Sequence, residues 1–460
     1  MRGIGKSLKW SLAIVLVLAA APLRAATNDV NVLVWNHTSD RVAADVRGFA
    51  LWPLLERIAK ETGWNIFVEP GSKHEASAKF KDAPSGQALR LLLGDLNFAL
   101  VPQTNGPNHL YVFRTGVGSA TQQVRPAGGA TAKTGRRVPN ELIVRVRPGT
   151  DIEALARLLG AKIVGRIPEL NAYRFQFEND EVTENARKLL AGNPDVASVQ
   201  DNYFVDVPQF PETVAGMVAP ETKLKLDPPE AGACQVVIGL VDTALQTLSP
   251  PLEAFVKERV SVVGDSKLDP SEPTHATATF NAAYQAMQSA GITTTRVQTI
   301  SVNVFDGSSA NTFNVAAGMI TAGNRGATVI NASLGGYGDS PLLRDAVKQL
   351  ASHNIPVFAA VGNDGSSSAF YPAAYPEVIS VTAVERGKVA PYANLGTQPD
   401  AAAPGSVLFS YNGVTYGSRG TSVSSAAVAG IAAGLAGANC QPWSQVIPTV
   451  EKNLPVPTAK

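Results

Sequence analysis

The sequence predicts an α/β protein whose C-terminal half is a doubly wound parallel sheet, preceded by two small α+β units. From Gln235 onward, continuous apolar runs typical of strands buried on both faces alternate with helical stretches. The length of 460 residues allows about three domains, and only 17% of the residues are charged, too few for a disordered chain. With 39 Lys and Arg against 38 Asp and Glu, the charge balance argues against a nucleic-acid-binding protein.

The first 25 residues have the layout of a secretory signal peptide. Three basic residues precede an apolar run over 10–20 that is too short for a membrane helix, and small residues follow at Ala25 and Ala26. We therefore predict removal of residues 1–25 and a secreted or periplasmic protein with no membrane span after that removal. A single N-terminal anchor helix is the alternative.

Residues 42–114 are predicted to form a small α+β domain in the order strand, helix, strand, strand, helix, strand, strand. Apolar residues spaced three and four positions apart predict a first helix that ends at Gly63. A strand is predicted at Trp64–Val68 and a second helix at Ala88–Leu93. The segments PLLERIAKETGWNIFV, APSGQALRLLLGDLNFAL and HLYVFR resemble the secretin and TonB short N-terminal domain. That resemblance implies docking to a cell-envelope partner; a generic α+β domain without a partner is the alternative.

A linker, a second α+β unit and a further linker follow. Residues 115–137 are rich in Gly, Ala, Thr and Gln without an apolar period and are predicted to be flexible. Residues 138–207 follow the order strand-helix-strand-strand-helix-strand of a ferredoxin-like unit. The Pro-rich stretch 208–233 is predicted to be unstructured and easily reached by a protease.

The sheet domain is placed at residues 234–440, with a C-terminal tail over 441–460. Its predicted strands are Val236–Val241, Thr299–Phe305, Ala327–Asn331, Ile355–Val361 and Val378–Val384. Its predicted helices are Thr277–Ala290, Asn314–Gly323 and Leu342–His353. Reactive groups of such sheets collect at the carboxyl ends of the strands.

Asp242 and His275 are the candidates for a general base and the carboxylate that orients it. Asp242 directly follows the strand QVVIGLV, where a carboxylate can hold an imidazole by its ring N–H. Three of the other histidines precede the sheet domain, and His353 ends a helix, where a cation suits the dipole. A turn or capping Asp and a partly buried structural His are the alternatives.

Ser422 and Asn363 are the candidates for a nucleophile and an oxyanion donor. Ser422 stands where glycine turns the chain into an Ala- and Gly-rich helix, whose N-terminal dipole favours negative charge. Asn363 ends the strand IPVFAAVG beside glycines, where its amide can donate to an oxyanion. A plain helix N-cap, for which Thr421 and Ser424 would serve equally well, and an ordinary turn Asn are the alternatives.

Six motifs together resemble the subtilase family of serine proteases. They are VVIGLVDT, THAT, INASLGG, PVFAAVGNDG, YPAAYPEVISVTAV and GTSVSSAAVAG, in the order and spacing of that family. The similarity covers roughly residues 235–440, and the unit at 138–207, with NPDVASVQDNYFV near its end, resembles the family's inhibitory propeptide.

The resemblance implies a role for each candidate residue. Asp242 would orient His275, His275 would take the proton of Ser422, and Ser422 would attack the peptide carbonyl to form an acyl-enzyme. Asn363 and the backbone N–H of Ser422 would hold the oxyanion. No cofactor is implied, and no acidic loop for a structural calcium ion is found.

The resemblance also implies the substrate path. Ser333, Leu334 and Gly335 would form the strand that pairs with an extended peptide substrate. Residues 359–362, of which Ala359, Ala360 and Gly362 are small, would wall the first specificity pocket, and their size predicts a roomy apolar pocket.

Several residues depart from the family pattern. Ala244 and Ala276 occupy positions where the family usually has glycine. Ala278 replaces a second histidine, and Ala426-Ala427 replaces Pro-His. None of these changes removes a reacting atom. They nevertheless support an alternative function, a catalytically inactive protein that binds envelope components through its N-terminal domain.

The sequence therefore predicts a secreted serine endopeptidase made as a precursor that its own propeptide inhibits, acting on protein or peptide substrates. An enzyme confined to an envelope assembly by residues 42–114 is a further alternative. Cys234 and Cys440 would mature in an oxidising compartment, where one disulfide and two free thiols both stay open.

Overall fold

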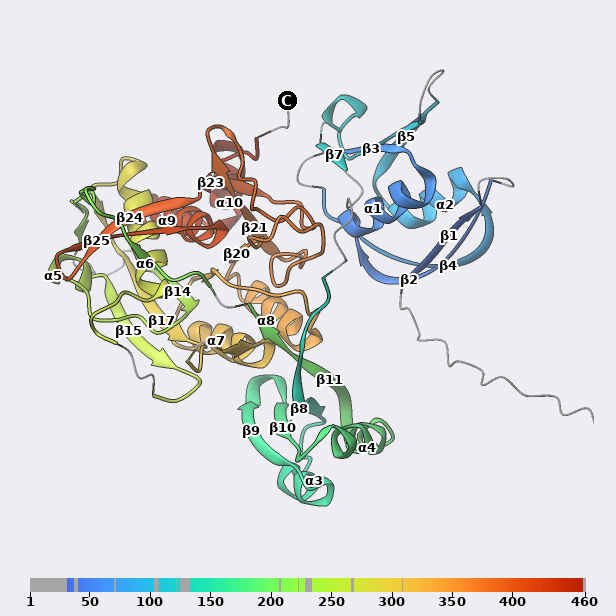
Figure 1. The fold of residues 1–460 in the computed structure, drawn as a ribbon, viewed down its shortest axis with the longest axis horizontal. Coiled ribbons are helices and arrows are strands. Elements are labelled where there is room, and N and C mark those ends of the chain that lie inside the picture. Colours follow the sequence, from blue (N-terminus) through green and yellow to red (C-terminus); the bar gives the residue numbers. More distant parts are fainter. Residues whose placement is uncertain are drawn as a thin grey trace, which may run out of the picture.

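The computed structural model describes residues 31–36, 40–69, 72–102, 107–120, 122–124, 133–206, 208–221, 223–227, 234–265, 269–307 and 309–457, which form three folded units (Figure 1). The predicted signal peptide lies outside these residues. Figure 1 shows the first unit, in blue, beside the largest unit, and the second unit, in green, below it.

The first unit packs two helices against two small sheets. Its elements are β1 (Val32–Asn36), β2 (Arg41–Ala50), α1 (Leu51–Thr62), β3 (Asn65–Val68), β4 (Glu75–Pro84), α2 (Ser85–Leu93), β5 (Asn97–Val101), β6 (His109–Phe113), a 3₁₀ turn (Val117–Ser119) and β7 (Gln122–Val124). The strand orders are β1-β2-β4 and β5-β6-β3-β7. The apolar stripe of α1 enters the core, where Leu54, Leu55 and Ile58 are fully buried.

The limits predicted for this unit are too narrow at both ends. Strand β1 precedes residue 42 and pairs with β2, and β7 lies within the predicted linker 115–137 and pairs with β3. Arg137, the last residue of the predicted linker, is already the first residue of strand β8 of the second unit. Short strands of this kind carry little periodicity, and only their pairing partners define them.

The second unit is a four-stranded antiparallel sheet with two helices. Its elements are β8 (Arg137–Val146), α3 (Ile152–Leu159), β9 (Lys162–Ile167), a 3₁₀ turn (Pro168–Leu170), β10 (Ala172–Gln176), α4 (Asp180–Ala191) and β11 (Val196–Val205), in the sheet order β9-β10-β8-β11. Both helices begin at side-chain caps, Asp151 and Asn179. The end of β11 extends beyond the unit and pairs with β18 (Ala310–Asn311) of the third unit.

The stretch 208–233, predicted to be unstructured, contains two short strands on the third unit. Residues Glu212–Thr213 (β12) pair with β25 (Val414–Arg419), and Lys225–Leu226 (β13) pair with β16 (Thr294–Thr295). The prediction failed because these strands form through pairing with distant segments, which local composition does not report.

The third unit is the doubly wound sheet. Its further strands are β14 (Val236–Asp242), β15 (Val256–Ser261), β17 (Val297–Asn303), β19 (Val329–Ala332), β20 (Val357–Ala360), β21 (Val378–Glu385), β22 (Lys388–Val389), β23 (Ala401–Pro404) and β24 (Ser406–Tyr411). Its helices are α5 (Pro250–Glu253), α6 (His275–Ser289), α7 (Thr312–Asn324), α8 (Pro341–Ser352), α9 (Thr421–Asn439) and α10 (Trp443–Asn453).

Strands β15-β17-β14-β19-β20-β21 are parallel neighbours, and each face of this sheet has its own core. Successive side chains of β14 point to opposite faces: Val237 and Val241 join the core under α7 and α8, and Ile238 and Leu240 join the core under α6 and α9. This alternation places helices on both faces of the sheet (Figure 1).

Helix α9 runs through the centre of one core. A Cβ atom on Gly430 would lie 2.3 Å from the carbonyl oxygen of Ala283, so glycine permits the close contact between α9 and α6. Residues Thr421–Ala438 are long and apolar enough to span a membrane, but 83% of this window is buried in the protein. The hydrophobicity of the helix therefore follows from its place in the core.

The predicted C-terminal tail is partly wrong. Residues 443–453 form α10, whose Trp443, Val446 and Val450 are buried in the same core as α9. A disulfide joins Cys234 before β14 to Cys440 at the end of α9, with the Cα atoms 5.4 Å apart. This bond resolves the choice that the sequence left open for the two cysteines.

Candidate active site

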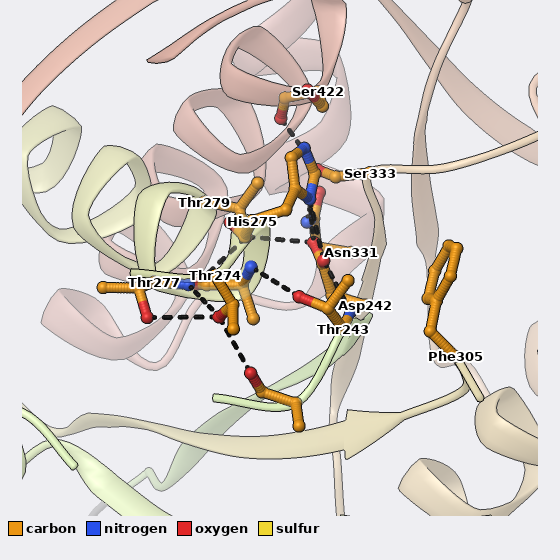
Figure 2. Close-up of polar contacts among 12 residues, drawn as sticks. Asp242, Thr243, Thr274, His275, Thr277, Thr279, Phe305, Asn331, Ser333 and Ser422 are labelled. Atoms are coloured by element: carbon orange, nitrogen blue, oxygen red, sulfur yellow. Dashed lines mark hydrogen bonds and ion pairs between the residues drawn. The ribbon is translucent and has the colours of Figure 1, made fainter. Parts of the chain in front are cut away.

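Asp242 and His275 form a buried pair at the carboxyl edge of the sheet. The Nδ1 atom of His275 lies 2.7 Å from Oδ1 and 3.0 Å from Oδ2 of Asp242, and the side chains are 1% and 0% exposed (Figure 2). An ionised carboxylate only accepts hydrogen bonds, so Nδ1 donates and Nε2 keeps a lone pair. The pair thus holds the imidazole in the tautomer that a general base needs.

Two further donors fix the carboxylate of Asp242. The backbone N–H of Thr243 donates to Oδ1 at 2.6 Å, and the hydroxyl of Thr279 donates to Oδ2 at 3.0 Å. The sequence analysis missed Thr279, although its place four residues after His275 on one helix face was a usable signal. Together these bonds satisfy the buried carboxylate and stop it from turning away from the ring.

Ser422 approaches the other side of the imidazole. Figure 2 shows Ser422, in the first turn of α9, next to the His275 ring. Ser422 is 7% exposed, and the Nε2 atom of His275 is buried without a hydrogen-bond partner among the described residues. Nε2 is therefore buried and unpaired among the described residues, on a ring that lies beside Ser422.

Gly420 gives the chain its sharp entry into α9. Its φ is +147°, and a Cβ there would lie 3.0 Å from Nδ2 of Asn363 and 3.3 Å from the hydroxyl oxygen of Ser422. A side chain at this position would therefore intrude between the hydroxyl and the amide. Glycine leaves that space open for a reacting group.

Asn363 presents its amide N–H₂ to the same space. Its Oδ1 accepts from the backbone N–H of Thr421 at 2.8 Å and from the Thr421 hydroxyl at 2.9 Å. These two bonds identify which end of the amide is the oxygen, so the donor end, Nδ2, faces Gly420 and Ser422. Asn363 is an exposed residue, open to an incoming ligand.

A row of buried polar side chains is hydrogen-bonded to the first turn of α9, the turn that carries Ser422. The hydroxyl of Ser333 donates to the carbonyl of Ser422 at 2.7 Å, Nδ2 of Asn331 donates to Ser333 at 2.9 Å, and Ser425 donates to Oδ1 of Asn331 at 2.8 Å. Ser333 was predicted to lie in the substrate strand, Thr421 was considered only as a helix cap, and Asn331 and Ser425 were not predicted. In the structure the side chain of Ser333 is 2% exposed and acts on the turn that carries Ser422.

The alanines that depart from the family pattern fit without displacing the pair. Ala276, Ala278 and Ala426 are completely buried in the core around α6 and α9. The backbone N–H of Ala276 donates to the Thr243 hydroxyl at 3.0 Å, next to Asp242. These substitutions therefore give no structural support to a disabled site.

The roomy apolar pocket predicted beside residues 359–362 is occupied at least in part by an aromatic ring. Leu334, Ala359 and Ala360 are buried, and the ring of Phe370 occupies the space between Gly335 and Gly362. The sequence placed the walls of this pocket but not the residue that fills it, because Phe370 comes from a separate loop.

The segment after β11 crosses the site from one edge to the other. Before the site, Phe204 and Val205 pair with β18, and the N–H of Asp206 donates to the carbonyl of Gly335 at 2.8 Å. Beyond it, Glu212 and Thr213 pair with β25. The described residues Asp206 and Glu212 are therefore held at two edges of the region that contains Ser422 and His275.

A cavity of about 610 Å³ lies beside this crossing segment. Phe210 and Pro211 line it together with Thr243, Ala244 and Thr274, the neighbours of the Asp242–His275 pair. Among the residues that the structure describes, no group of three His, Cys, Asp or Glu side chains is arranged to hold a metal ion.

Comparisons with known proteins agree with this geometry. A model of the subtilase family matches residues 234–455, and a model of the fervidolysin N-terminal prodomain matches residues 125–202. A thermophilic serine proteinase of Bacillus sp. (strain AK1) is 30% identical over 320 residues, which cover 66% of this chain and 79% of that protein. Thermitase of Thermoactinomyces vulgaris is 34% identical over 206 residues, which cover 43% and 74%.

Solved structures share the fold. Fervidolysin from Fervidobacterium pennivorans, a keratinolytic enzyme related to subtilisin, superimposes with a TM-score of 0.51 at 19% identity and covers 69% of this chain and 57% of its own. The epidermin leader peptide processing protease EpiP from Staphylococcus aureus gives a TM-score of 0.50 at 15% identity and covers 68% and 91%.

Proposed function

Because this chain belongs to the subtilase family of serine proteases, we propose that it is an exported endopeptidase, made as a self-inhibited precursor, with Asp242, His275 and Ser422 as its catalytic triad. The observation that carries the proposal is the buried Asp242–His275 pair, whose Nε2 has no hydrogen-bond partner among the described residues and whose ring lies beside Ser422.

The chemistry follows from the placement of these groups. Nε2 of His275 takes the proton of Ser422 as its oxygen attacks the peptide carbonyl, and Asp242 stabilises the imidazolium that forms. The imidazolium then gives this proton to the leaving amine, and water hydrolyses the acyl-enzyme by the same steps.

The oxyanion receives donors from two sides. Nδ2 of Asn363 is oriented by Thr421, and the backbone N–H of Ser422 lies in the first turn of α9, where N–H groups have no acceptor within the helix. Each such donor lowers the barrier by about 3–4 kcal/mol.

The second unit inhibits the enzyme by filling its cleft. The tail from Asp206 to Glu212 crosses the site like an extended substrate, held by main-chain bonds at both edges. We place the maturation cut within this crossing segment. Export rests on the predicted signal peptide and is supported by the disulfide, since disulfides persist in oxidising compartments.

The first unit is proposed to dock to a cell-envelope partner. Its likeness to the secretin and TonB short N-terminal domain is the support, and no described residue of this unit reaches Ser422 or His275 through a hydrogen bond or ion pair. A pull-down with the full chain and with a variant lacking residues 42–114 tests this role. Equal recovery of envelope proteins by both would contradict it.

Processing of the purified full chain tests the triad. We expect Ser422→Ala to remain an uncut precursor, with its rate of maturation reduced by at least about 10⁴-fold. Ser424→Ala is the matched control, because its hydroxyl donates to the carbonyl of Ala403 and does not face His275. Maturation of Ser422→Ala at the normal rate would contradict self-processing, and failure of the wild-type protein to react with a fluorophosphonate would favour the inactive binding protein.

A further inference from the structure

Two backbone segments flank the nucleophile and define a slot beside it. Ser333, at the start of one segment, donates to the carbonyl of Ser422 at 2.7 Å. The N–H of Gly362, at the end of the other, donates to the hydroxyl of Thr421 at 3.1 Å. Both segments are bonded to the turn that carries the Ser422 hydroxyl, so a substrate side chain next to the scissile carbonyl would lie within reach of the space between them.

The ring of Phe370 lies in this slot. A Cβ atom on Gly335 would be 2.4 Å from Cε1 of the ring, and a Cβ on Gly362 would be 3.1 Å from its Cγ. One ring therefore touches both walls, and Phe370 is 4% exposed. The glycines at 335 and 362 leave room for this ring and not for a wide substrate pocket.

Neighbouring residues hold the ring in place. Tyr337 packs against it edge-on, with ring centroids 5.2 Å apart. The next residue, Tyr371, exchanges two main-chain hydrogen bonds with Gly336, at 2.8 and 2.9 Å. The backbone that carries Phe370 is thus tied to the wall that the ring touches, so withdrawal of the ring would break packing on both sides.

We propose that Phe370 is the specificity-determining residue of this protease and limits the residue on the acyl side of the scissile bond to side chains no larger than valine. This inference rests on the proposed function. A close-packed slot does not admit a second aromatic ring without displacing the first. Pro208, in the tail segment beyond Asp206, has a side chain of the permitted size.

Active-site labelling tests the proposal on the full chain after maturation. The probes are two α-aminoalkyl diphenyl phosphonates, with a methyl or a benzyl side chain at the position of that residue, and an alkyl fluorophosphonate without one. We expect the wild-type enzyme to react with the methyl probe about 10- to 200-fold faster than with the benzyl probe, the range that pocket size alone provides. Phe370→Ala removes or inverts this ratio, and Phe370→Leu gives an intermediate ratio.

Phe255→Ala is the matched control. It also removes a buried ring, 1% exposed, but one that packs on Tyr284 near the amino ends of the strands. A shift in the ratio caused by general loosening of the fold would appear in this variant too, and we expect none.

The outcomes separate the two claims. A wild-type enzyme that reacts with both phosphonates within twofold would overturn the role of Phe370, as would an unchanged ratio in a fluorophosphonate-reactive Phe370→Ala or Phe370→Leu. A wild-type chain that fails to react with the fluorophosphonate would overturn the proposed function, and the specificity inference would fall with it.

Discussion

The second unit (residues 137–205, the proposed inhibitory unit) and the first unit (residues 32–124, the N-terminal unit) both contact the third unit, the proposed catalytic domain. The two contacts consist of different kinds of bonds. The inhibitory unit joins by strand pairing: β11 extends into β18, and the tail pairs with β25 (Figure 1). The N-terminal unit joins through side chains: Lys73 contacts Asp400 at 3.0 Å and the carbonyl of Val378 at 2.7 Å, and Arg344 pairs with Glu75 at 2.6 Å.

The kind of bond that holds each unit is consistent with the role proposed for that unit. Main-chain pairing holds a segment in substrate register whatever its side chains are, which suits an inhibitor that must occupy a protease cleft. A few partly exposed ion pairs contribute little and weaken with salt, which suits a unit that exchanges partners. We therefore expect the two contacts to respond to different changes.

Two side chains of β11 strengthen its contact by completing the helices of the catalytic domain. Oδ1 of Asn202 accepts from the N–H of Phe313 at 3.2 Å, in the first turn of α7, and its Nδ2 donates to Glu141 at 2.8 Å. Oε1 of Gln200 accepts from the N–H of Leu342 in α8 at 3.1 Å. The inhibitory unit thus satisfies first-turn donors that the helices themselves leave free.

The largest effect is expected for Asn202→Ala. Asn202 is fully buried, and its loss leaves Glu141 and the N–H of Phe313 without this partner, at a cost of about 1–3 kcal/mol for each unsatisfied group. In the Ser422→Ala precursor we expect the tail to be cut by added thermolysin about 10- to 100-fold faster. Gel densitometry over time measures the rate.

Asn179→Ala is the control for this prediction. Asn179 caps α4 inside the inhibitory unit and accepts from Val182, so its loss weakens that unit without touching the catalytic domain. Equal acceleration by Asn179→Ala and Asn202→Ala would show that stability of the unit, and not its contact with α7, controls release.

A smaller effect is expected from pH at Asp206, the residue that enters the cleft. Burial raises the pKa of its carboxyl above the usual 3.8, Asp364 raises it further, and Lys133 and Arg136 oppose this shift. The docked tail therefore binds a proton more tightly than the released tail, and docking weakens as the pH rises from about 3.8 through the raised pKa.

We expect the thermolysin cutting rate to rise severalfold across that pH range in the Ser422→Ala precursor, after correction for the pH profile of thermolysin on a model peptide. Asp206→Asn should flatten the rise, while Asp195→Asn, at an exposed turn of the same unit, should keep it. A rise that persists in Asp206→Asn would assign the pH dependence to other groups.

The smallest effect is expected for Lys73→Ala in the contact of the N-terminal unit. The side chain of Lys73 is 31% exposed, whereas that of Asp400 is only 5% exposed. Asp400 keeps its hydrogen bonds from Ser380 when Lys73 is removed, so we expect a loss of about 1 kcal/mol, which corresponds to a fewfold change in the docked population. Amide hydrogen exchange within residues 376–378, which is reported by Glu377 and Val378 because Pro376 has no N–H, should increase in the variant, and in the wild-type protein at high salt. Fluorophosphonate labelling of Ser422 should stay unchanged.

Lys79→Ala is the control for this contact, because Lys79 pairs with Asp45 within the N-terminal unit. Loss of labelling in Lys73→Ala would contradict the separation of the two contacts. Unchanged exchange at residues 376–378 would show that apolar packing, and not Lys73, holds the unit.

Local sequence was sufficient for the elements that carry a clear period. The run Val236–Val241 and the helix around Asn314–Gly323 were placed within one or two residues of β14 and α7. The structure also brings Asp242, His275, Ser422 and Asn363 together at one edge of the sheet, as expected for residues that follow parallel strands or begin a helix beside them.

Short or edge elements that contribute few residues to the core were missed. Strand β15 alternates exposed and partly buried residues at the sheet edge, α10 contains Pro448, and β12 has only two residues. Each is stabilised by a partner distant in sequence, so its own residues carry a weak signal.

The sequence by itself determined the order of the main strands and helices, the candidate reacting residues and the small side chains around them, because these depend on local periodicity and on residue chemistry. The tertiary structure alone decided the path of the tail across Ser422, the bonds of Thr279 and Thr421 that orient the site, and the ring of Phe370 in the slot. Each of these joins residues from segments or turns whose approach in space only the packed fold sets.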